Sequence, residues 1–471
     1  MRQIENLYIN GAFVTPHGTE RAPLFNPSTE AQIGTARLAN AEDVNAAIAA
    51  AKQAFPAFSR TSKAERIGML ERLSAAVSSR AGELTAAMAE EYGAPSSFIG
   101  FSVPHAAGAF LNMTKTLEAY AFRRTIGRSE VEMRPSGVAA AITPWNSNYG
   151  FICSKLATAI AAGTTIVIKP SEMSAIQTQV LTECLHQAGL PAGVFNIING
   201  TGSVAGAALS AHPDISKISF TGSTASGRAI LHAAAEGIKR VTLELGGKSP
   251  SIILDDADLP KVIPQVLTTG FGNSGQACID GTRILAPASR LDEILGALKT
   301  AASAFKVGAP HDPDVRIGPM VSQKQWDRVQ SYIRLGQKEG ATLLTGGEGR
   351  PEGLKRGWFV RPTIFSHATN QMRIAREEIF GPVLCVIPYT DEADAIEIAN
   401  DTQCGLASYI FSSNVERAKQ IASHIEAGRV VINAAPHDPL APFGGFKQSG
   451  IGREYGLFGL ESFLEPRAVL V

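Results

Sequence analysis

Three short segments carry side chains that could together perform covalent chemistry on a carbonyl group. Cys278 ends Gly275-Gln276-Ala277-Cys278, where small neighbours let a substrate approach the sulfur. Glu244 opens Glu244-Leu245-Gly246-Gly247-Lys248, and Asn146 ends Pro144-Trp145-Asn146. A thiol nucleophile, a carboxylate base and an amide that donates hydrogen bonds to an oxyanion are the parts that such a reaction requires.

Each of these residues also has an ordinary structural interpretation. An isolated cysteine is usually a small core hydrophobe, and this interpretation applies to the cysteines in apolar patterns: Cys153, Cys184, Cys385 and Cys404. Cys278 differs because the polar, glycine-rich run 270–276 precedes it, which predicts an exposed turn. Glu244 lies in a predicted apolar strand, so it is either paired or kept as a general base with a raised pKa. Asn146 could sit in a common turn, and Lys155 could be a surface charge.

The order and spacing of these motifs resemble the aldehyde dehydrogenase superfamily (NAD(P)-dependent, non-acylating), from Tyr8-Ile9-Asn10-Gly11 to the end of the chain. The resemblance implies that Cys278 is the nucleophile, Glu244 the general base and Asn146 an oxyanion donor together with the Cys278 N–H. Lys155 matches a lysine that helps to orient the site. The implied reaction oxidises an aldehyde to its acid with NAD, through a Cys thiohemiacetal and a thioester hydrolysed by Glu-activated water.

Three alternatives stay open beside this reaction. A CoA-acylating relative would pass the acyl group to CoA, but such relatives commonly lack the glutamate. A binding protein could keep the fold without turnover, although this chain keeps both nucleophile and base. A hydrolytic thiol esterase would leave the motifs for NAD unexplained.

Further motifs predict a dinucleotide site. The run 220–227 predicts a strand, a turn of small residues and a helix start, which can present N–H groups to phosphate. The run 200–206 looks like G-x-G-x-x-G, but its last spacing is one residue too long, so we do not expect pyrophosphate there. Lys169-Pro170-Ser171-Glu172 directly follows a predicted strand, where α/β proteins bind nucleotides. The run 377–382 matches a family motif whose second acid holds the nicotinamide ribose.

The resemblance implies a set of cofactor-binding residues: Thr143, Pro144, Trp145, Lys169, Ser171, Glu172, Gly222, Ser223, Leu245, Glu378 and Phe380. A carboxylate at Glu172 should repel a 2′-phosphate, so NAD is favoured over NADP. Nine histidines without ligand spacing, and five cysteines without a C-x-x-C pair, argue against a metal site and a disulfide framework.

Composition excludes other classes of function. Lys+Arg and Asp+Glu are equal at 43 each, so the formal net charge is zero. Without a net positive charge, the composition does not favour nucleic acid as a partner. The polar start fits no targeting peptide, and the longest apolar run, 156–168, falls short of the ~20 residues that a membrane helix needs. We expect a soluble cytoplasmic protein that takes a small aldehyde and binds no membrane.

The pattern of elements predicts an α/β fold with a nucleotide-binding parallel-sheet domain, a second α/β catalytic domain and a small β oligomerisation arm. We expect the NAD-binding domain over 1–118 and 138–245, the catalytic domain over 246–440, and the oligomerisation domain over 119–137 and 451–471. Helices are predicted over 41–57, 62–92 (as two), 151–162, 175–188 and 204–211. Strands are predicted over 137–142, 165–168, 195–198, 215–220, 249–254, 283–285, 383–387 and 430–432, with arm strands in 126–133 and 465–471. The resemblance implies a homodimer or homotetramer.

The substrate end of the site carries unusual residues. Ser147 and Ser154 stand where relatives often have large aromatic side chains. Asp280 is an acid two residues after the nucleophile, which either faces the substrate or points away. The loop Pro436-His437-Asp438-Pro439 adds polar groups near the expected pocket mouth. These residues favour a small or medium polar aldehyde, with aminoaldehydes and semialdehydes left open.

Overall fold

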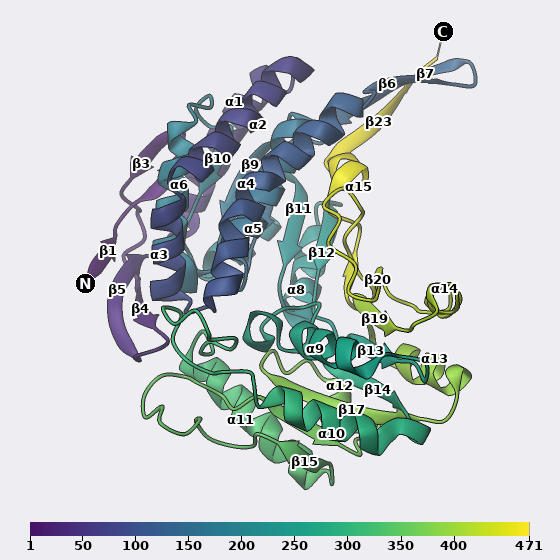
Figure 1. The fold of residues 1–471 in the computed structure, drawn as a ribbon. Coiled ribbons are helices and arrows are strands. Elements are labelled where there is room, and N and C mark those ends of the chain that lie inside the picture. The colour runs from purple at the N-terminus through teal and green to yellow at the C-terminus, as the bar shows by residue number, and fades with distance from the viewer. Residues whose placement is uncertain (471) are drawn as a thin grey trace.

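A parallel β-sheet with helices on both faces forms the first half of the computed structural model, which describes residues 1–470 (Figure 1). Its strand order is β22-β12-β11-β8-β9-β10-β2-β3. The strands β8 to β12 run parallel to their neighbours, whereas β2, β3 and β22 pair antiparallel at the edges. The bounds are β2 Leu7–Ile9, β3 Ala12–Val14, β8 Val138–Ile142, β9 Thr165–Lys169, β10 Phe195–Ile197, β11 Ile215–Thr221, β12 Arg240–Glu244 and β22 Gly450–Ile451.

Alternation along the central strands sends side chains into two separate cores. Val138, Ala140 and Ile142 of β8 belong to one buried cluster, and Ala139 and Ala141 to the other. Successive strand residues point to opposite faces, so a strand covered by helices on both sides is apolar throughout. The covering helices are α1 Ala41–Phe58, α2 Lys63–Ser79, α3 Ala81–Glu91, α4 Ser96–Ala119, α5 Asn148–Ala162, α6 Ala175–Gln187, α7 Ala207–Ala211 and α8 Thr224–Ala235.

A seven-stranded sheet, of order β15-β16-β17-β14-β13-β19-β20, forms the second α/β unit at the bottom of Figure 1. Only β15 pairs antiparallel with its neighbour. The strands are β13 Pro250–Ile253, β14 Arg283–Pro287, β15 Thr342–Thr345, β16 Thr363–Ser366, β17 Val383–Tyr389, β19 Ala407–Phe411 and β20 Arg429–Ile432. The helices are α9 Leu259–Gly270, α10 Leu291–Ala302, α11 Gln323–Lys338, α12 Arg373–Arg376, α13 Glu392–Asn400 and α14 Val415–Ala422.

A three-stranded arm projects from the molecule and ends near the C-terminus (Figure 1). It combines the hairpin β6 Arg123–Ile126 and β7 Ser129–Pro135 with β23 Leu464–Val469, which follows α15 Gly456–Glu461. Glu132 of β7 forms ion pairs with Arg123 and with Arg467, so charges link all three strands.

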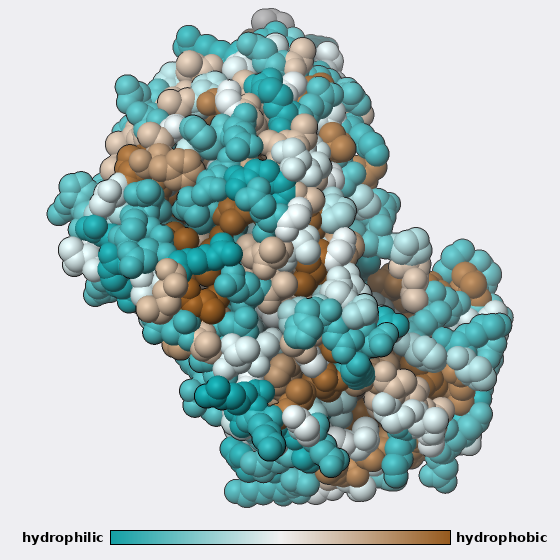
Figure 2. Space-filling model, turned by 60° about the vertical axis from the view of Figure 1, so that its left-hand side comes forward, coloured by the Kyte–Doolittle hydropathy of each residue, from teal (hydrophilic) through white to brown (hydrophobic). Residues whose placement is uncertain are grey.

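Small sheets and short turns complete the fold. The sheets comprise β1 Arg2–Ile4, β4 Arg21–Asn26 and β5 Ala31–Arg37, and β18 Cys404–Gly405 with β21 Phe446–Lys447. The short turns are Glu172–Ser174, the π-helical turn Gly202–Gly206, Gly272–Gly275 and Ala288–Arg290. Hydrophilic side chains cover most of the face in Figure 2, and hydrophobic ones gather in small groups between them. Within residues 1–470, every helix falls short of the length and apolarity that crossing a bilayer takes.

The sequence-based elements are confirmed in type throughout both sheets and the arm, and three details differ. The helix predicted over 151–162 begins at Asn148, and the one over 204–211 starts as the π-helical turn before α7. Cys404, expected in the core, is half-buried in the two-residue β18, whereas Cys153, Cys184 and Cys385 are buried as expected. Of the strand predicted over 465–471, Val471 lies outside the described residues.

Candidate active site

The carboxyl ends of four neighbouring parallel strands bring the sequence motifs together. Strand β8 leads into Thr143-Pro144-Trp145-Asn146, β9 into Lys169-Pro170-Ser171-Glu172, β11 into Gly222-Ser223, and β12 ends at Glu244. The strand order runs outward in both directions from β8, with β9 on one side and β11 on the other. Such a switch point leaves a crevice outside the carboxyl ends of the strands, where α/β proteins bind ligands.

Two adjoining cavities occupy this crevice. One of about 310 Å³ holds Cys278, Glu244 and Asn146, and one of about 620 Å³ holds Lys169 and Glu172. Both are lined by Pro144 and by the turn Thr221-Gly222-Ser223. All the predicted site residues except Lys155 therefore line one continuous space.

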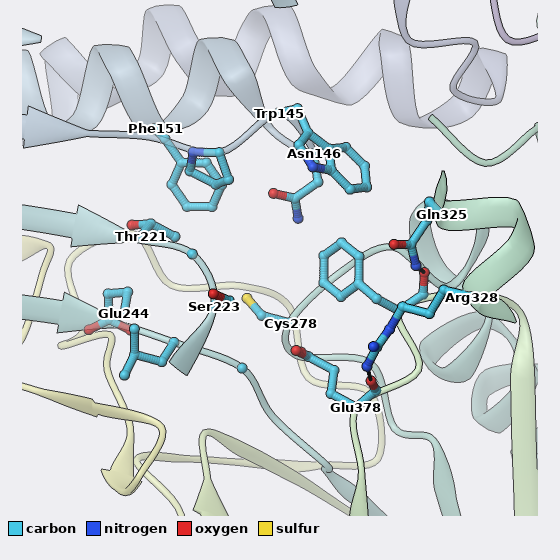
Figure 3. A pocket seen from close by; sticks show the side chains of 15 residues that line it. Trp145, Asn146, Phe151, Thr221, Ser223, Glu244, Cys278, Gln325, Arg328 and Glu378 are labelled. Atoms are coloured by element: carbon cyan, nitrogen blue, oxygen red, sulfur yellow. Dashed lines mark hydrogen bonds between the residues drawn. The ribbon is translucent and has the colours of Figure 1, made fainter. Parts of the chain in front are cut away.

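Cys278 faces the smaller cavity, and its sulfur lies near the centre of the group of side chains in Figure 3. The turn before it is buried, which corrects the expectation that the run 270–276 is exposed. Its polar side chains bond inward: the Ser274 hydroxyl accepts from the Gly318 N–H at 2.8 Å, and Asn273 Nδ2 donates to the Asn146 carbonyl at 2.9 Å. Burial raises the pKa of the Cys278 thiol, and the carboxyl groups around it raise the pKa further.

Glu244 is a carboxyl group without a protein partner. Its residue is 2% exposed, and neither side-chain oxygen has a hydrogen bond within residues 1–470. Burial raises its pKa well above the usual range, nearby Glu454 raises it further, and Lys155 and Arg453 oppose this. Of the two sequence-based interpretations, the paired carboxylate is wrong; the group lines the cavity that holds Cys278.

Asn146 is held against the cysteine turn. Its Nδ2 donates to the Gln276 carbonyl at 2.9 Å, and the residue is 6% exposed. In Figure 3 the Asn146 amide points down toward the Cys278 sulfur. Because an amide NH₂ group carries two donors, one hydrogen remains for a group in the cavity.

Lys155 lies deeper than the other predicted residues. Its Nζ donates to the Ser219 hydroxyl at 2.8 Å and forms a buried ion pair with Glu454, which also accepts from Ser219 at 3.0 Å. The alternative of a surface charge is wrong, since the residue is 2% exposed. Through its effect on the Glu244 pKa, Lys155 acts on the site electrostatically rather than as a lining residue.

The larger cavity has the features of a dinucleotide site. Ser223 caps α8 by accepting from the Ser226 N–H, and the cavity runs along this helix start. Helix N-termini favour phosphate. Lys169 Nζ lies 3.5 Å from a Glu172 carboxylate oxygen, a pair of groups suited to ribose hydroxyls. Gly202, Ser203 and Gly206 also line this cavity, so the run that did not fit the G-x-G-x-x-G pattern still forms part of its wall.

The loop around Glu378 closes the smaller cavity. The Gly247 N–H donates to the Glu378 carboxylate at 3.1 Å, and a Cβ at Gly246 would collide with that carboxylate. Burial raises the pKa of Glu378 to about 7. Phe380 adopts φ +62° and packs edge-on against Trp145, with ring centroids 5.5 Å apart.

Three residues that line the smaller cavity were not singled out from the sequence. Gln325 Nε2 donates to the Phe380 carbonyl at 2.7 Å, and Arg328 donates to the Glu378 carbonyl at 2.5 Å, as the dashed lines in Figure 3 show. Both lie on the polar helix α11, which carries no motif. Phe151 is the third and lies in the first turn of α5, the helix that follows the Pro144-Trp145-Asn146 motif.

Asp280 points away from the cavity. It is 5% exposed and accepts a hydrogen bond from the Ala277 N–H at 3.1 Å, so it braces the turn that carries Cys278. Burial raises its pKa well above the usual range. Of the two roles left open for this acid, contact with substrate is wrong.

Comparisons with known proteins agree with this geometry. A sequence model described as "Aldehyde dehydrogenase family" matches residues 13–469. A 3-succinoylsemialdehyde-pyridine dehydrogenase of Pseudomonas sp is 45% identical over 100% of this chain and 99% of its own length. Aldehyde dehydrogenase C of Pseudomonas syringae, solved as a cysteine-to-alanine mutant with NAD+ and octanal, has a TM-score of 0.98 at 42% identity, covering 99% of this chain and 96% of that one. An NAD+ complex of a Mycobacterium tuberculosis aldehyde dehydrogenase has a TM-score of 0.97 at 41% identity, covering 100% and 98%.

The cysteine turn depends on Gly275, which has φ +74° and lies against the Gly381 backbone. We expect Gly275→Ala to destabilise the protein by about 1–3 kcal/mol and to slow alkylation of Cys278, because an alanine is strained there and its Cβ collides. Urea unfolding and iodoacetamide kinetics measure both effects. The matched control is Gly296→Ala on the exposed side of α10, where a Cβ meets nothing within 4 Å; loss of stability there as well would contradict the argument.

Burial of Glu244 should make stability depend on pH. Below the ordinary carboxyl pKa both the folded and unfolded states bind the proton. Above it the unfolded chain releases the proton while the folded state retains it, so stability falls until pH passes the raised folded pKa. Glu244→Gln removes this loss, and its melting temperature should therefore exceed that of the wild type by a margin that grows from pH 4 to pH 8. Exposed Glu20→Gln should show no such trend, and an equal trend in both variants would refute the assignment.

Proposed function

Because the chain belongs to the aldehyde dehydrogenase family, we propose that it oxidises an aldehyde to the carboxylic acid through a covalent intermediate on Cys278. The observation that carries this proposal is the shared cavity of Cys278, Glu244 and Asn146, next to a second cavity of about 620 Å³. The aldehyde is the substrate and NAD the cofactor. The presence of Glu244 favours hydrolysis over transfer to CoA.

The first part of the reaction belongs to Cys278 and Asn146. The thiolate attacks the aldehyde carbon and forms a thiohemiacetal, whose oxygen becomes an oxyanion. Asn146 Nδ2, already fixed by the Gln276 carbonyl, donates its second hydrogen to this oxygen together with the Cys278 N–H. A donor fixed beforehand stabilises the developing charge without reorganising in the transition state.

The larger cavity fits NAD by its donor set, and we propose Thr143, Pro144, Lys169, Ser171, Glu172, Gly222 and Ser223 as its adenosine and phosphate contacts, with Trp145, Leu245, Glu378 and Phe380 at the nicotinamide end. When bound, NAD+ accepts the hydride from the aldehyde carbon, so that aldehyde, NAD+ and water become acid, NADH and a proton. The Glu172 carboxylate disfavours a 2′-phosphate.

Glu244 completes the reaction by activating water. Its carboxylate takes a proton from the water that attacks the thioester, and the cysteine leaves as thiolate. The raised pKa of Glu244 suits a base that must accept a proton near neutral pH. Lys155 and Glu454, deeper in the protein, set the charge around this carboxyl group.

The domain assignment remains part of the proposal. Residues 1–118 and 138–245 hold NAD, residues 246–440 carry the nucleophile, and residues 119–137 and 451–471 form the arm for a homodimer or homotetramer. The exposed Ile126, Ile451 and Leu470 in these last two segments support an assembly surface. For the substrate we propose a neutral aldehyde of medium size, because the Pseudomonas relative is named for a pyridine semialdehyde and the solved relative holds octanal.

Turnover tests the proposal directly. With NAD and a panel of aldehydes, without CoA, absorbance should report NADH formation. Cys278→Ala should lower kcat by roughly 10³ or more while NAD still binds. Glu244→Gln should give a burst of about one NADH per site followed by slow turnover, because the thioester forms but is not hydrolysed. Full turnover of Cys278→Ala, or a steady rate without a burst in Glu244→Gln, would refute the assigned roles.

Cofactor choice gives a second test. Replacing Glu172 by serine removes the charge that opposes a 2′-phosphate, so kcat/KM with NADP should rise relative to NAD by about tenfold or more. The control is Glu183→Ser on α6, outside the cavity. An unchanged NADP-to-NAD ratio in Glu172→Ser would contradict its place beside the ribose.

A further inference from the structure

A small chamber, separate from the two cavities described above, lies along α5. It lies beyond the catalytic cavity, which is the cavity that holds Cys278. Phe151 of this helix lines the catalytic cavity, and Ser154 and Thr158 line the chamber. At a rise of 1.5 Å per residue, the chamber lies roughly 5–10 Å from Phe151 along the helix. Tyr455, which also lines it, is close enough to Cys278 and Glu244 for their charges to act on its hydroxyl. The chamber is therefore within reach of the far end of a medium-sized substrate.

Aromatic and imidazole rings form the walls of this chamber. The His105 ring stacks on Phe101 with centroids 4.9 Å apart, and it lies 5.9 Å from the His437 ring. His437 in turn lies 6.0 Å from the Tyr455 ring. Small residues make room for this group: a Cβ at Gly150 would lie 3.2 Å from the His105 ring and 2.9 Å from the Ser147 hydroxyl. Gly150 therefore lies between this histidine and Ser147, which stands where relatives often have a large aromatic side chain.

Ser154 and Thr158 of this chamber donate to backbone carbonyls of α5, but four of its polar side chains have no protein partner in the described part of the chain. Within residues 1–470, the side chains of His105, Asn112 and His437 and the Tyr455 hydroxyl make no hydrogen bond. His437 is exposed and the other three residues are half-buried, so these unpartnered groups are open to a ligand or to water. The free volume of about 20 Å³ holds about one water or one polar atom of a substrate.

The chamber carries no net charge of its own. None of its lining side chains is an acid, a lysine or an arginine. Burial lowers the pKa of His105, and burial together with Arg429 and His105 lowers the pKa of His437 to about 4 against the opposing effect of Asp438. Both imidazoles are therefore neutral at neutral pH, and each offers one donor and one acceptor nitrogen. A charged substrate group would find no counterion among the side chains that line the chamber.

We propose that His105 and His437 determine specificity by binding the far end of the aldehyde, which is a neutral planar ring with a hydrogen-bond acceptor atom. The acceptor atom enters the chamber and takes an imidazole N–H, and the ring packs against the exposed Phe101 and its stacked His105. This inference rests on the proposed aldehyde oxidation and names the substrate class of that site. The short distance along α5 calls for a spacer of a few carbon atoms between ring and aldehyde.

The test compares aldehydes of one length. Each has two methylene groups between the aldehyde and a pyridin-3-yl, phenyl or cyclohexyl ring, or a carboxylate, and butanal serves as the reference. We expect kcat/KM of the wild type to fall in the order pyridyl, phenyl, cyclohexyl, carboxylate, with pyridyl above phenyl by about 3- to 10-fold, the value of one hydrogen bond. Equal values for the three rings, or the carboxylate as the best substrate, would overturn the proposal.

Variants locate the effect within the chamber. His437→Phe and His105→Phe keep a flat ring but lose the N–H, so the pyridyl-to-phenyl ratio should fall to about 1 in at least one of them while phenyl stays above cyclohexyl. Ratios are measured within each variant, so a general loss of activity cancels. Exposed His424→Ala is the control and should keep the wild-type ratio. A ratio unchanged in both phenylalanine variants would refute the role of the histidines.

Butanal separates this proposal from the function on which it rests. If the protein oxidises butanal but shows no preference among the rings, the proposal about the chamber is wrong and the proposed function stands. If the wild-type protein oxidises no aldehyde, both the proposed function and the proposed role of the chamber are wrong.

Discussion

A carboxyl group buried without a partner is the constraint on which the rest of the site depends. Glu244 loses its hydration at the end of β12, and no donor from residues 1–470 replaces it. Such burial is unfavourable and is tolerated only where the surroundings are strongly determined. Here β12 is fixed by pairing with β11 on one side and β22 on the other, and Gly444 leaves room because a Cβ there would lie 2.7 Å from the Glu244 carboxylate. The same desolvation gives the group the proton affinity that a base near neutral pH requires.

Cys278 lies in the second α/β unit, before β14, so the two α/β units must meet accurately to place it beside Glu244. Gln276 provides the connection, since its carbonyl accepts from Asn146 and its side chain binds the Pro319 carbonyl and the Val321 N–H. These contacts join the loop after β8 to the loop before α11. The Asn146 amide and the turn that carries the Cys278 sulfur are thus held together by one residue. Positioning of this kind accounts for much of an enzyme's rate advantage.

The sequence predicted the elements better than it predicted burial. Capping signals such as Asn40 with Asp43 identified α1, and short apolar runs between turns identified the parallel strands. The prediction that the glycine-rich turn before Cys278 is exposed was wrong. Its polar side chains suggest contact with water, but Ser274 and Asn273 form hydrogen bonds to segments far away in the sequence. Gln325 and Arg328 were missed for a similar reason: α11 is a polar surface helix, and only its packing beside the Glu378 loop brings these residues to the cavity. Local pattern determines the type of an element, but the contacts between distant segments determine which residues reach the site.

The cavity around Cys278 and the chamber along α5 differ in their ionisable side chains. Around the sulfur, Glu244, Glu378 and Asp280 all raise the pKa of Cys278, and burial raises the pKa of each of these carboxyl groups as well. Farther along α5 the lining side chains are uncharged, and within residues 1–470 those of His105, Asn112, His437 and Tyr455 lack hydrogen-bond partners. Discrimination between similar aldehydes is weak when it depends on apolar packing alone, and it becomes strong where a missing hydrogen bond leaves a buried polar group unpaired. In the proposed arrangement, neutral donors at the far end select the substrate without disturbing the carboxyl groups around Cys278, because the histidines lie outside the cavity that holds the sulfur.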